Sequence, residues 1–196
     1  EIGENVLGTS YGYANGGKGA NQASALAQLG AKVKMIGKVA DDANGNKLLE
    51  SLKSKGIDIS GVATDGSQTG LAAIILDGDG RNRIIVYEGA NAEIDPQQTV
   101  KSIEGKTNLL LVQFETAEDV VVNAVNHAIK NNITTVIDCG PAKSFCLEKM
   151  QGATILSPNE SETKALTGIY PDSNDNILAA AKVLKERSKA KYIVLK

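Results

Sequence analysis

The sequence is short of the features on which several classes of function depend. Its 196 residues carry 21 basic and 23 acidic side chains, a formal net charge of −2. This balance favours neither nucleic acid nor an anionic membrane as a partner. No apolar run approaches the roughly 18 residues needed to cross a bilayer, and no signal-peptide pattern opens the chain. Internal repeats, low-complexity tracts and linkers are absent from the sequence as well.

Cysteine and histidine are equally scarce. Cys139 and Cys146 lack the spacing of a metal site and have no second pair, so we expect reduced packing residues in a cytoplasmic protein. The only histidine, His127, falls inside an expected helix and away from every expected strand end. We therefore assign it to packing or to the surface and not to catalysis.

Apolar residues are plentiful, at 42% of the chain, which predicts a sizeable core and a single domain over residues 1–196. Strand-like runs alternate with helical patterns, the order typical of βαβ units and a largely parallel sheet. The expected strands are Val33–Val39, Leu109–Phe114, Thr135–Cys139, Thr154–Leu156 and Tyr192–Leu195. The expected helices are Ala20–Leu29, Asn44–Lys55, Ala117–Lys130, Glu160–Leu166 and Asn176–Ser188. Because the chain starts at Glu1 and stops directly after an apolar run, we expect a domain that is incomplete at both ends.

One segment interrupts this alternation. Two strand-like runs, Leu71–Leu76 and Arg83–Tyr87, flank the turn Asp77-Gly78-Asp79-Gly80. Asp-Gly steps supply the positive φ angles of tight turns, so the segment predicts an antiparallel hairpin. We expect a small projecting flap outside the parallel sheet, and an ordinary edge hairpin stays open as the alternative.

A glycine-rich turn, Asn15-Gly16-Gly17-Lys18-Gly19-Ala20-Asn21-Gln22, leads into the first expected helix. It is not a P-loop, because Gly19 stands where Ser or Thr must hold Mg²⁺, and it is not a dinucleotide fingerprint, because the third glycine is missing at Gln22. Lys18 donates hydrogen bonds whereas Asn21 both donates and accepts, so the helix tip suits a polyhydroxyl ligand. A flexible turn capped for helix formation is the alternative.

Polar side chains follow several of the expected strands, where open α/β sheets bind ligands. The candidates are Asp42, Glu115, Asp138 and Asn159. Glu115 comes directly after an apolar strand and either binds a ligand or favours the macrodipole of the next helix. Asn159, with Glu162 three residues later, is a close variant of a capping box and needs no ligand.

The octet Gly16-Gly17-Lys18-Gly19-Ala20-Asn21-Gln22-Ala23 resembles the first signature of the ribokinases, within the phosphofructokinase-B family of carbohydrate kinases. The resemblance runs through the whole chain. It also includes Gly37, Asp41-Asp42 with Gly45, Gly89-Ala90-Asn91, Gln113-Phe114-Glu115, and Ser157-Pro158-Asn159-Glu160 with Glu162. It implies a ribokinase-like three-layer α/β/α fold with a mostly parallel central sheet and a small antiparallel β lid, here the hairpin 71–87.

The resemblance also implies a reaction and its site: transfer of the ATP γ-phosphoryl group to the O5 hydroxyl of ribose, with Mg²⁺ and a monovalent cation (K⁺) as cofactors. The implied sugar-binding residues are Gly17, Lys18, Gly19, Ala20, Asn21 and Glu115. Asn159 is implied near the nucleotide phosphates, and Glu162 is implied to hold Mg²⁺ through water. The lid is implied to cover the sugar and to join two subunits in a homodimer.

The sequence departs from the family at two points. It contains no Gly-Ala-Gly-Asp stretch, whose Asp is the family's catalytic base, so no catalytic residue is assigned and we expect the chain alone to be inactive. Gly140 precedes Pro141-Ala142 where ribokinases often carry Asn, which leaves Asp138 without an assigned role. The alternatives are a nucleoside or other sugar kinase of the same family, and a sugar-binding or regulatory protein without catalysis.

Overall fold

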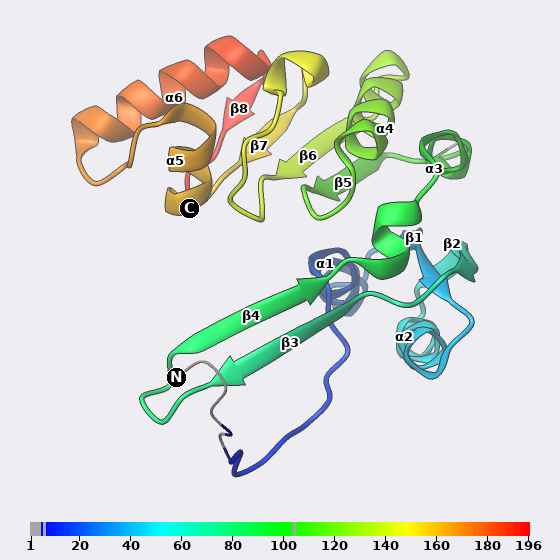
Figure 1. Cartoon of the computed structure of the whole chain (residues 1–196). Helices are drawn as coiled ribbons and strands as arrows, with labels where there is room; N and C mark the ends of the chain where they lie inside the picture. The colour runs from blue at the N-terminus through cyan, green and yellow to red at the C-terminus, as the bar shows by residue number, and fades with distance from the viewer. Residues whose placement is uncertain (1–4, 6, 104) are drawn as a thin grey trace.

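The computed structural model describes residue 5, residues 7–103 and residues 105–196. Its strands form three sheets (Figure 1). β1 (Lys34–Ala40) pairs in parallel with β2 (Asp58–Gly66), and β3 (Leu71–Leu76) pairs antiparallel with β4 (Asn82–Tyr87). The largest sheet is parallel and contains, in spatial order, β5 (Leu109–Gln113), β6 (Thr134–Asp138), β7 (Ile155–Ser157) and β8 (Tyr192–Ile193). The expected class, a mostly parallel α/β fold with one antiparallel hairpin, is confirmed.

The helices alternate with these strands along the chain. They are α1 (Lys18–Gln28), α2 (Ala43–Ser54), α3 (Pro96–Ile103), α4 (Glu118–Lys130), α5 (Glu160–Thr167) and α6 (Asn174–Ser188), with two short 3₁₀ turns, η1 (Gly89–Glu93) and η2 (Leu147–Met150). Gly30 and Gly56 follow α1 and α2 with φ angles of 85° and 74°, the left-handed conformation that ends a helix with little strain. No helix in the described ranges is both long enough and apolar enough to cross a membrane.

Two elements were not expected from the sequence, β2 and α3. β2 contains Gly61, which indicates a turn when the sequence is considered alone, but a Cβ there would lie only 2.7 Å from the Met35 carbonyl oxygen. Close approach to β1 therefore explains this glycine. α3 begins with Pro96 after Asp95, whose Oδ1 accepts the Gln97 N–H at 2.7 Å. This is an ordinary helix start with proline in the first position.

The main core lies between the four-stranded sheet and the helices α4, α5 and α6. Its centre is a stacked pair of rings, Phe114 and Phe145, with centroids 3.8 Å apart. A smaller cluster, Ala23, Leu52 and Ile57, packs α1 and α2 against β1 and β2. The core therefore holds the residues just before Glu115 firmly in place, because Phe114 is fully buried.

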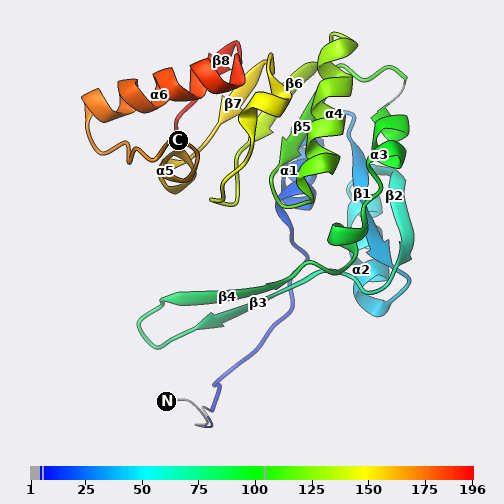
Figure 2. The same ribbon diagram turned by 45° about the horizontal axis from the view of Figure 1, so that its top comes forward.

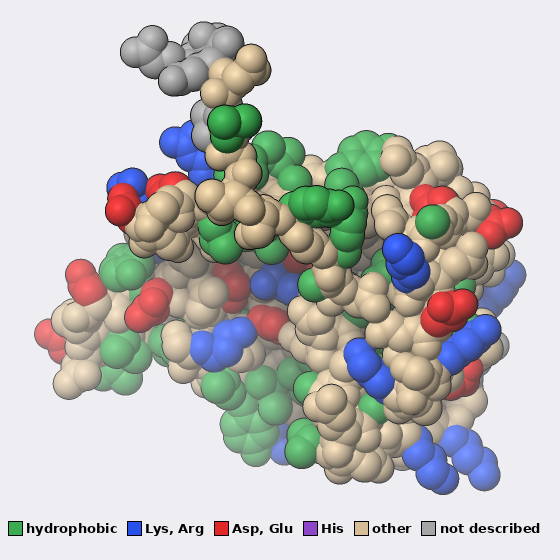
Figure 3. All heavy atoms as spheres, turned by 90° about the horizontal axis from the view of Figure 1, so that it is seen from below, with side chains coloured by type: hydrophobic (Ala, Val, Ile, Leu, Met, Phe, Trp, Pro, Cys, Tyr) green, Lys and Arg blue, Asp and Glu red, His purple; other side chains and the backbone are tan. Residues whose placement is uncertain are grey.

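The hairpin of β3 and β4 projects from the rest of the molecule (Figures 1 and 2). Hydrophobic side chains are exposed along its strands, and charged side chains lie at its tip (Figure 3). Ile74, Leu76, Ile85 and Val86 are each at least 60% exposed. The expected projecting flap is therefore present as a separate antiparallel sheet.

Candidate functional site

The register of the four-stranded sheet aligns three positions at its carboxyl edge. Gln113 of β5 is paired with Asp138 of β6, and Asp138 is paired with Ser157 of β7. The residues two positions further along the chain are Glu115, Gly140 and Asn159. Parallel pairing therefore brings these three residues to one edge, where open α/β sheets bind ligands.

The N-terminus of α1 lies against this edge. Gly17 is the N-cap residue, at φ 92°, and has no side chain with which to satisfy the first free N–H groups of the helix. Glu115 supplies the missing acceptor, because its Oε2 accepts the Lys18 N–H at 3.0 Å. The Glu115 carboxylate thus lies at the positive end of the α1 dipole. The contact observed is with α1 and not with the next helix, α4.

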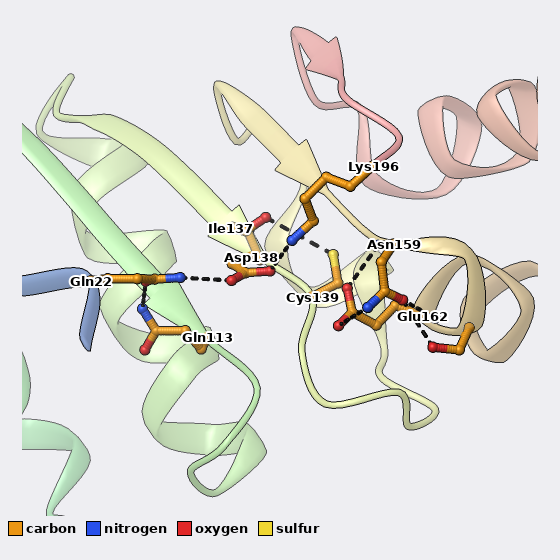
Figure 4. A network of polar contacts seen from close by, with 9 residues as sticks. Gln22, Gln113, Ile137, Asp138, Cys139, Asn159, Glu162 and Lys196 are labelled. Carbon is orange, nitrogen blue, oxygen red and sulfur yellow. Dashed lines mark hydrogen bonds and ion pairs between the residues drawn. The ribbon is translucent and has the colours of Figure 1, made fainter. Parts of the chain in front are cut away.

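A polar network joins α1 to the edge of the sheet (Figure 4). Gln22 Nε2 donates to Asp138 Oδ2 at 2.6 Å, and Gln113 Nε2 donates to the side-chain amide oxygen of Gln22, Oε1. Lys196 Nζ pairs with the other oxygen of Asp138 at 2.7 Å. Asp138, left unassigned by sequence, therefore fixes α1 on the sheet, since both its oxygens are engaged by protein groups.

Asn159 and Glu162 form a complete capping box at the start of α5 (Figure 4). Glu162 Oε2 accepts the Asn159 N–H at 2.8 Å, Asn159 Oδ1 accepts the Glu162 N–H at 2.8 Å, and Asn159 Nδ2 donates to Glu162 Oε1 at 3.0 Å. Glu162 is only 4% exposed. The structural role expected from the spacing is confirmed.

The Glu162 carboxylate also suits Mg²⁺ as a water-mediated partner. Two of its roughly four lone-pair sites are used by Asn159, which leaves acceptors for the waters that Mg²⁺ retains. The described residues contain no group of three or more His, Cys, Asp or Glu side chains placed to hold a metal directly. A hydrated ion beside phosphates fits this donor set better than a cation enclosed by protein groups.

Lys18 connects the two parts of the site, one at Glu115 and the other at Glu162. Its backbone N–H contacts Glu115, while the end of its side chain lies at Gly140 beside Glu162: a Cβ at Gly140 would be 3.1 Å from Lys18 Nζ and 2.8 Å from Glu162 Oε1. A residue predicted for the sugar, Lys18, and one predicted for Mg²⁺, Glu162, are therefore neighbours. The sequence did not indicate the contact between Lys18 and Glu115, because the two residues are 97 positions apart.

The other predicted sugar-binding residues are spread around α1. Gly19 packs beside Gln113, with a virtual Cβ 3.3 Å from its Oε1. Ala20 and Asn21 line a small hollow between α1 and α2, together with Leu48. The structure thus joins Lys18 to Glu115 and places Asn21 toward α2.

Asp42, the remaining strand-end candidate, lies at the root of the hairpin. It caps α2 by accepting the Gly45 N–H at 2.7 Å, and it accepts both the N–H and the hydroxyl of Thr69, at 2.9 and 2.7 Å. These hydrogen bonds, the one from Gly45 first, lower the pKa of Asp42. Asp42 is therefore bonded within the fold and not to the residues around Lys18.

Neither His127 nor the cysteines belong to the site. His127 lies in α4, and Cys139 and Cys146 are free thiols. Burial raises the pKa of the Cys139 thiol, which opposes formation of a reactive thiolate.

A helix tip, a strand-end carboxylate and a capped helix meet here at the carboxyl edge of a parallel sheet, the place where α/β proteins bind small molecules. Comparison with known protein families matches residues 2–196 to the pfkB family carbohydrate kinases. The chain belongs to this family. The expected family and the ribokinase-like fold are thereby confirmed.

Similar proteins include the ribokinase of Bacillus subtilis (strain 168), which is 39% identical over 170 residues, or 85% of this chain and 57% of that protein. The deoxyribokinase of Salmonella typhi is 31% identical over 196 residues, covering 98% of this chain and 64% of that protein. The structure of Arabidopsis thaliana ribokinase complexed with ribose and ATP has a TM-score of 0.86 at 26% identity and covers 99% of this chain and 64% of that one. The chain thus spans about three fifths of the length of these relatives.

Proposed function

We propose that this chain is the sugar-binding part of an ATP-dependent ribokinase, which phosphorylates D-ribose at O5 and gives ribose 5-phosphate. One observation carries the proposal: Lys18 belongs to both halves of the site. Its N–H contacts Glu115, and its ammonium shares the space at Gly140 with Glu162. A sugar at the first point and phosphates at the second would lie side by side, as phosphoryl transfer requires.

In this proposal the sugar binds at the N-terminus of α1. Glu115 is exposed and already accepts one N–H there, so its remaining lone pairs are available to sugar hydroxyls. The first turn of the helix, residues 17–20, provides backbone N–H groups, whereas Asn21 lies toward α2 and its N–H already donates to the Gly17 carbonyl oxygen. The neighbouring Phe114 is fully buried, so the carboxylate is held in place before the sugar arrives.

The nucleotide phosphates bind on the other side of Lys18, near Asn159. Glu162 would hold hydrated Mg²⁺, which neutralises charge on the phosphates when bound. Similarity to ribokinases also favours a monovalent cation such as K⁺, but we assign none of the residues 1–196 to it.

The reaction needs a base that accepts the proton of the O5 hydroxyl. The Gly-Ala-Gly-Asp stretch that carries the family's base does not occur in this sequence. Turnover would therefore require a residue from outside residues 1–196, and the chain by itself is expected to bind but not to phosphorylate.

The hairpin is proposed as a lid and as the contact between two copies in a homodimer. In an antiparallel ladder, paired residues share a face, so Ile74 and Ile84 lie on one face and Ala73 and Ile85 on the other. The three isoleucines are 60%, 53% and 63% exposed. Because both faces are apolar, one can cover the sugar and exclude water while the other meets a second copy.

We also propose that residues 1–196 form one domain and act in the cytoplasm. The interlocked network of α1, β5 and β6 supports a single domain. The free thiols of Cys139 and Cys146 support a reducing compartment.

A second substrate deserves testing, because the relative from Salmonella typhi is a deoxyribokinase. 2-Deoxyribose differs from ribose only in lacking one hydroxyl, which Glu115 or the helix tip could hydrogen-bond. Other sugars, nucleosides and a purely sugar-binding role are the remaining alternatives.

Calorimetric titration of the chain with ribose, 2-deoxyribose, fructose and adenosine tests the proposal. We expect ribose to bind best, and Glu115→Ala to weaken it about tenfold or more, because a hydrogen bond to a charged group is lost. Glu160→Ala, which replaces an exposed glutamate of α5, is the control and should leave ribose affinity unchanged.

Turnover is tested in a protein that carries this chain together with a Gly-Ala-Gly-Asp stretch, by following transfer of labelled phosphate from ATP to each acceptor. Preference for adenosine would replace the proposed substrate with a nucleoside. Sugar binding without any transfer would favour the non-catalytic alternative.

A further inference from the structure

Gly140 lies against two charged side chains of the site, Lys18 and Glu162. A Cβ on Gly140 would lie 2.8 Å from Glu162 Oε1 and 2.9 Å from Lys18 Cε. The backbone cannot easily move away, because Gly140 is buried and its carbonyl oxygen accepts the Phe114 N–H at 2.8 Å. A side chain at this position must therefore displace the end of the Lys18 side chain and also push back the Glu162 carboxylate.

The structure indicates which of these two side chains would move farther. Glu162 is held by Asn159 at both oxygens and is almost fully buried, so a shift would break the capping box of α5. Lys18 meets Gly140 only with the end of a long and flexible side chain. Gly140 has no positive φ, so a substitution is not strained on that account. Lys18 is therefore the side chain that is expected to move farther.

We propose that Gly140 is a positioning residue for Lys18: the missing side chain lets the Lys18 ammonium lie beside the Glu162 carboxylate, where it selects a phosphate-bearing ligand. The part that concerns the ligand rests on the proposed function. An ammonium attracts a polyanion strongly, whereas a neutral sugar is held by the helix tip and by Glu115. Displacing the ammonium therefore affects the two ligands unequally.

Three glycine-to-alanine variants separate this role from a structural one. Gly140→Ala acts mainly on the flexible end of Lys18 and shifts Glu162 less, so its thermal midpoint should stay closer to the parent than that of Gly45→Ala. Gly45→Ala places a Cβ 2.2 Å from the Ala40 carbonyl oxygen and should lower the midpoint by several degrees. Gly12→Ala has nothing within 4 Å and should change nothing.

The position of Lys18 can be followed without any ligand, by NMR of the chain labelled with ¹³C at lysine Cε. The Lys18 signal is assigned by its loss in Lys18→Arg. Gly140→Ala should shift this signal and Gly12→Ala should not. Glu162→Gln should shift it in the parent but much less in the Gly140→Ala background. A Lys18 signal that Gly140→Ala leaves in place overturns the proposal.

Calorimetry with Mg-ATP and with ribose then tests the selectivity. Gly140→Ala should weaken Mg-ATP about tenfold, as expected for one lost charge-assisted contact, and change ribose affinity less than about twofold. Equal loss of both ligands, or loss of neither, overturns the proposed selectivity. If the parent binds neither ligand, the proposed function fails, and the NMR experiment still decides where Gly140 places Lys18.

Discussion

At the scale of single residues, an ion pair contributes most to stability where both side chains are held in a fixed geometry. Arg187 of α6 forms a two-pronged pair with Glu148 of η2, with Nε 2.6 Å from Oε1 and Nη2 3.1 Å from Oε2. The Arg187 guanidinium lowers the pKa of Glu148 to about 2. Fixed geometry distinguishes this pair from an ordinary surface ion pair, which contributes little.

This pair predicts a pH-dependent contribution to stability. Because the pKa of Glu148 is lower in the folded state, its contribution is complete above the ordinary glutamate pKa of about 4.3 and is lost as the pH falls toward about 2. Glu148→Gln should therefore lower the free energy of unfolding at pH 7, and the difference from the parent should shrink below about pH 4. Denaturant unfolding at several pH values measures this.

Glu186→Gln, which removes a carboxylate next to Arg187 in the sequence, controls for the loss of one charge. A difference between Glu148→Gln and the parent that stays constant from pH 7 to pH 3 would contradict the assignment.

The residues of the site were foreseeable in part. The octet beginning at Gly16 and the spacing of Asn159 and Glu162 are local patterns, so the sequence predicted the helix tip and the capping box. The partners of Asp138 were not foreseeable, because Gln22 lies 116 positions away and Lys196 lies 58 positions away. Gln22 belongs to the recognisable octet, whereas nothing in the sequence indicated Lys196.

At the scale of elements, the root of the hairpin is the feature that sequence patterns missed. Thr69 is 3% exposed, and its hydroxyl donates to Asp42 Oδ1 at 2.7 Å and accepts the Ala40 N–H at 3.0 Å. On the other side of the root, Glu93 accepts the Ser67 N–H at 3.0 Å. The hairpin is thus fixed to β1, α2 and η1 at its base while its strands remain exposed.

Thr69→Val should loosen this root. The substitution keeps the shape of the side chain but removes one of the three hydrogen bonds to Asp42 and leaves the Ala40 N–H without its partner, at a cost of about 1–3 kcal/mol. Hydrogen exchange of residues 71–87 should become faster, and Thr69→Ser, which keeps the hydroxyl, should restore much of the protection. Equal exchange in the Val and Ser variants would contradict this role of the hydroxyl.

The elements themselves were largely predictable. Each expected strand and helix is present, with ends that differ by at most two residues. The hairpin was clear because its Asp-Gly turn is a local signal. β2 was missed because Gly61 has a tertiary cause, the close approach of Met35, which no local pattern records.

At the scale of the whole molecule, the hairpin of β3 and β4 is notable for its many exposed apolar side chains. Its pattern is apolar on both faces, whereas a strand pair with one solvated face alternates apolar and polar residues. The molecule therefore carries a surface that another copy can cover.

Sedimentation of the chain tests this assembly. We expect the parent to form a dimer, and of two substitutions on opposite faces, Ile74→Lys and Ile85→Lys, we expect one to give monomers and the other to leave the dimer intact. Leu178→Lys in α6, at an equally exposed leucine away from the hairpin, is the control. A parent that sediments only as a monomer would count against a dimer through the lid.

The sequence by itself determined the α/β class, the flap, the helix tip at Lys18 and the cap at Asn159, because each depends on neighbours a few residues apart whose turn chemistry and periodicity are local. Only the tertiary structure decided that Glu115 caps α1, that Asp138 fastens α1 to the sheet, and that Gly140 leaves room for the end of Lys18 near Glu162. Those contacts join residues from distant parts of the chain, and the register of the parallel strands brings them to one edge.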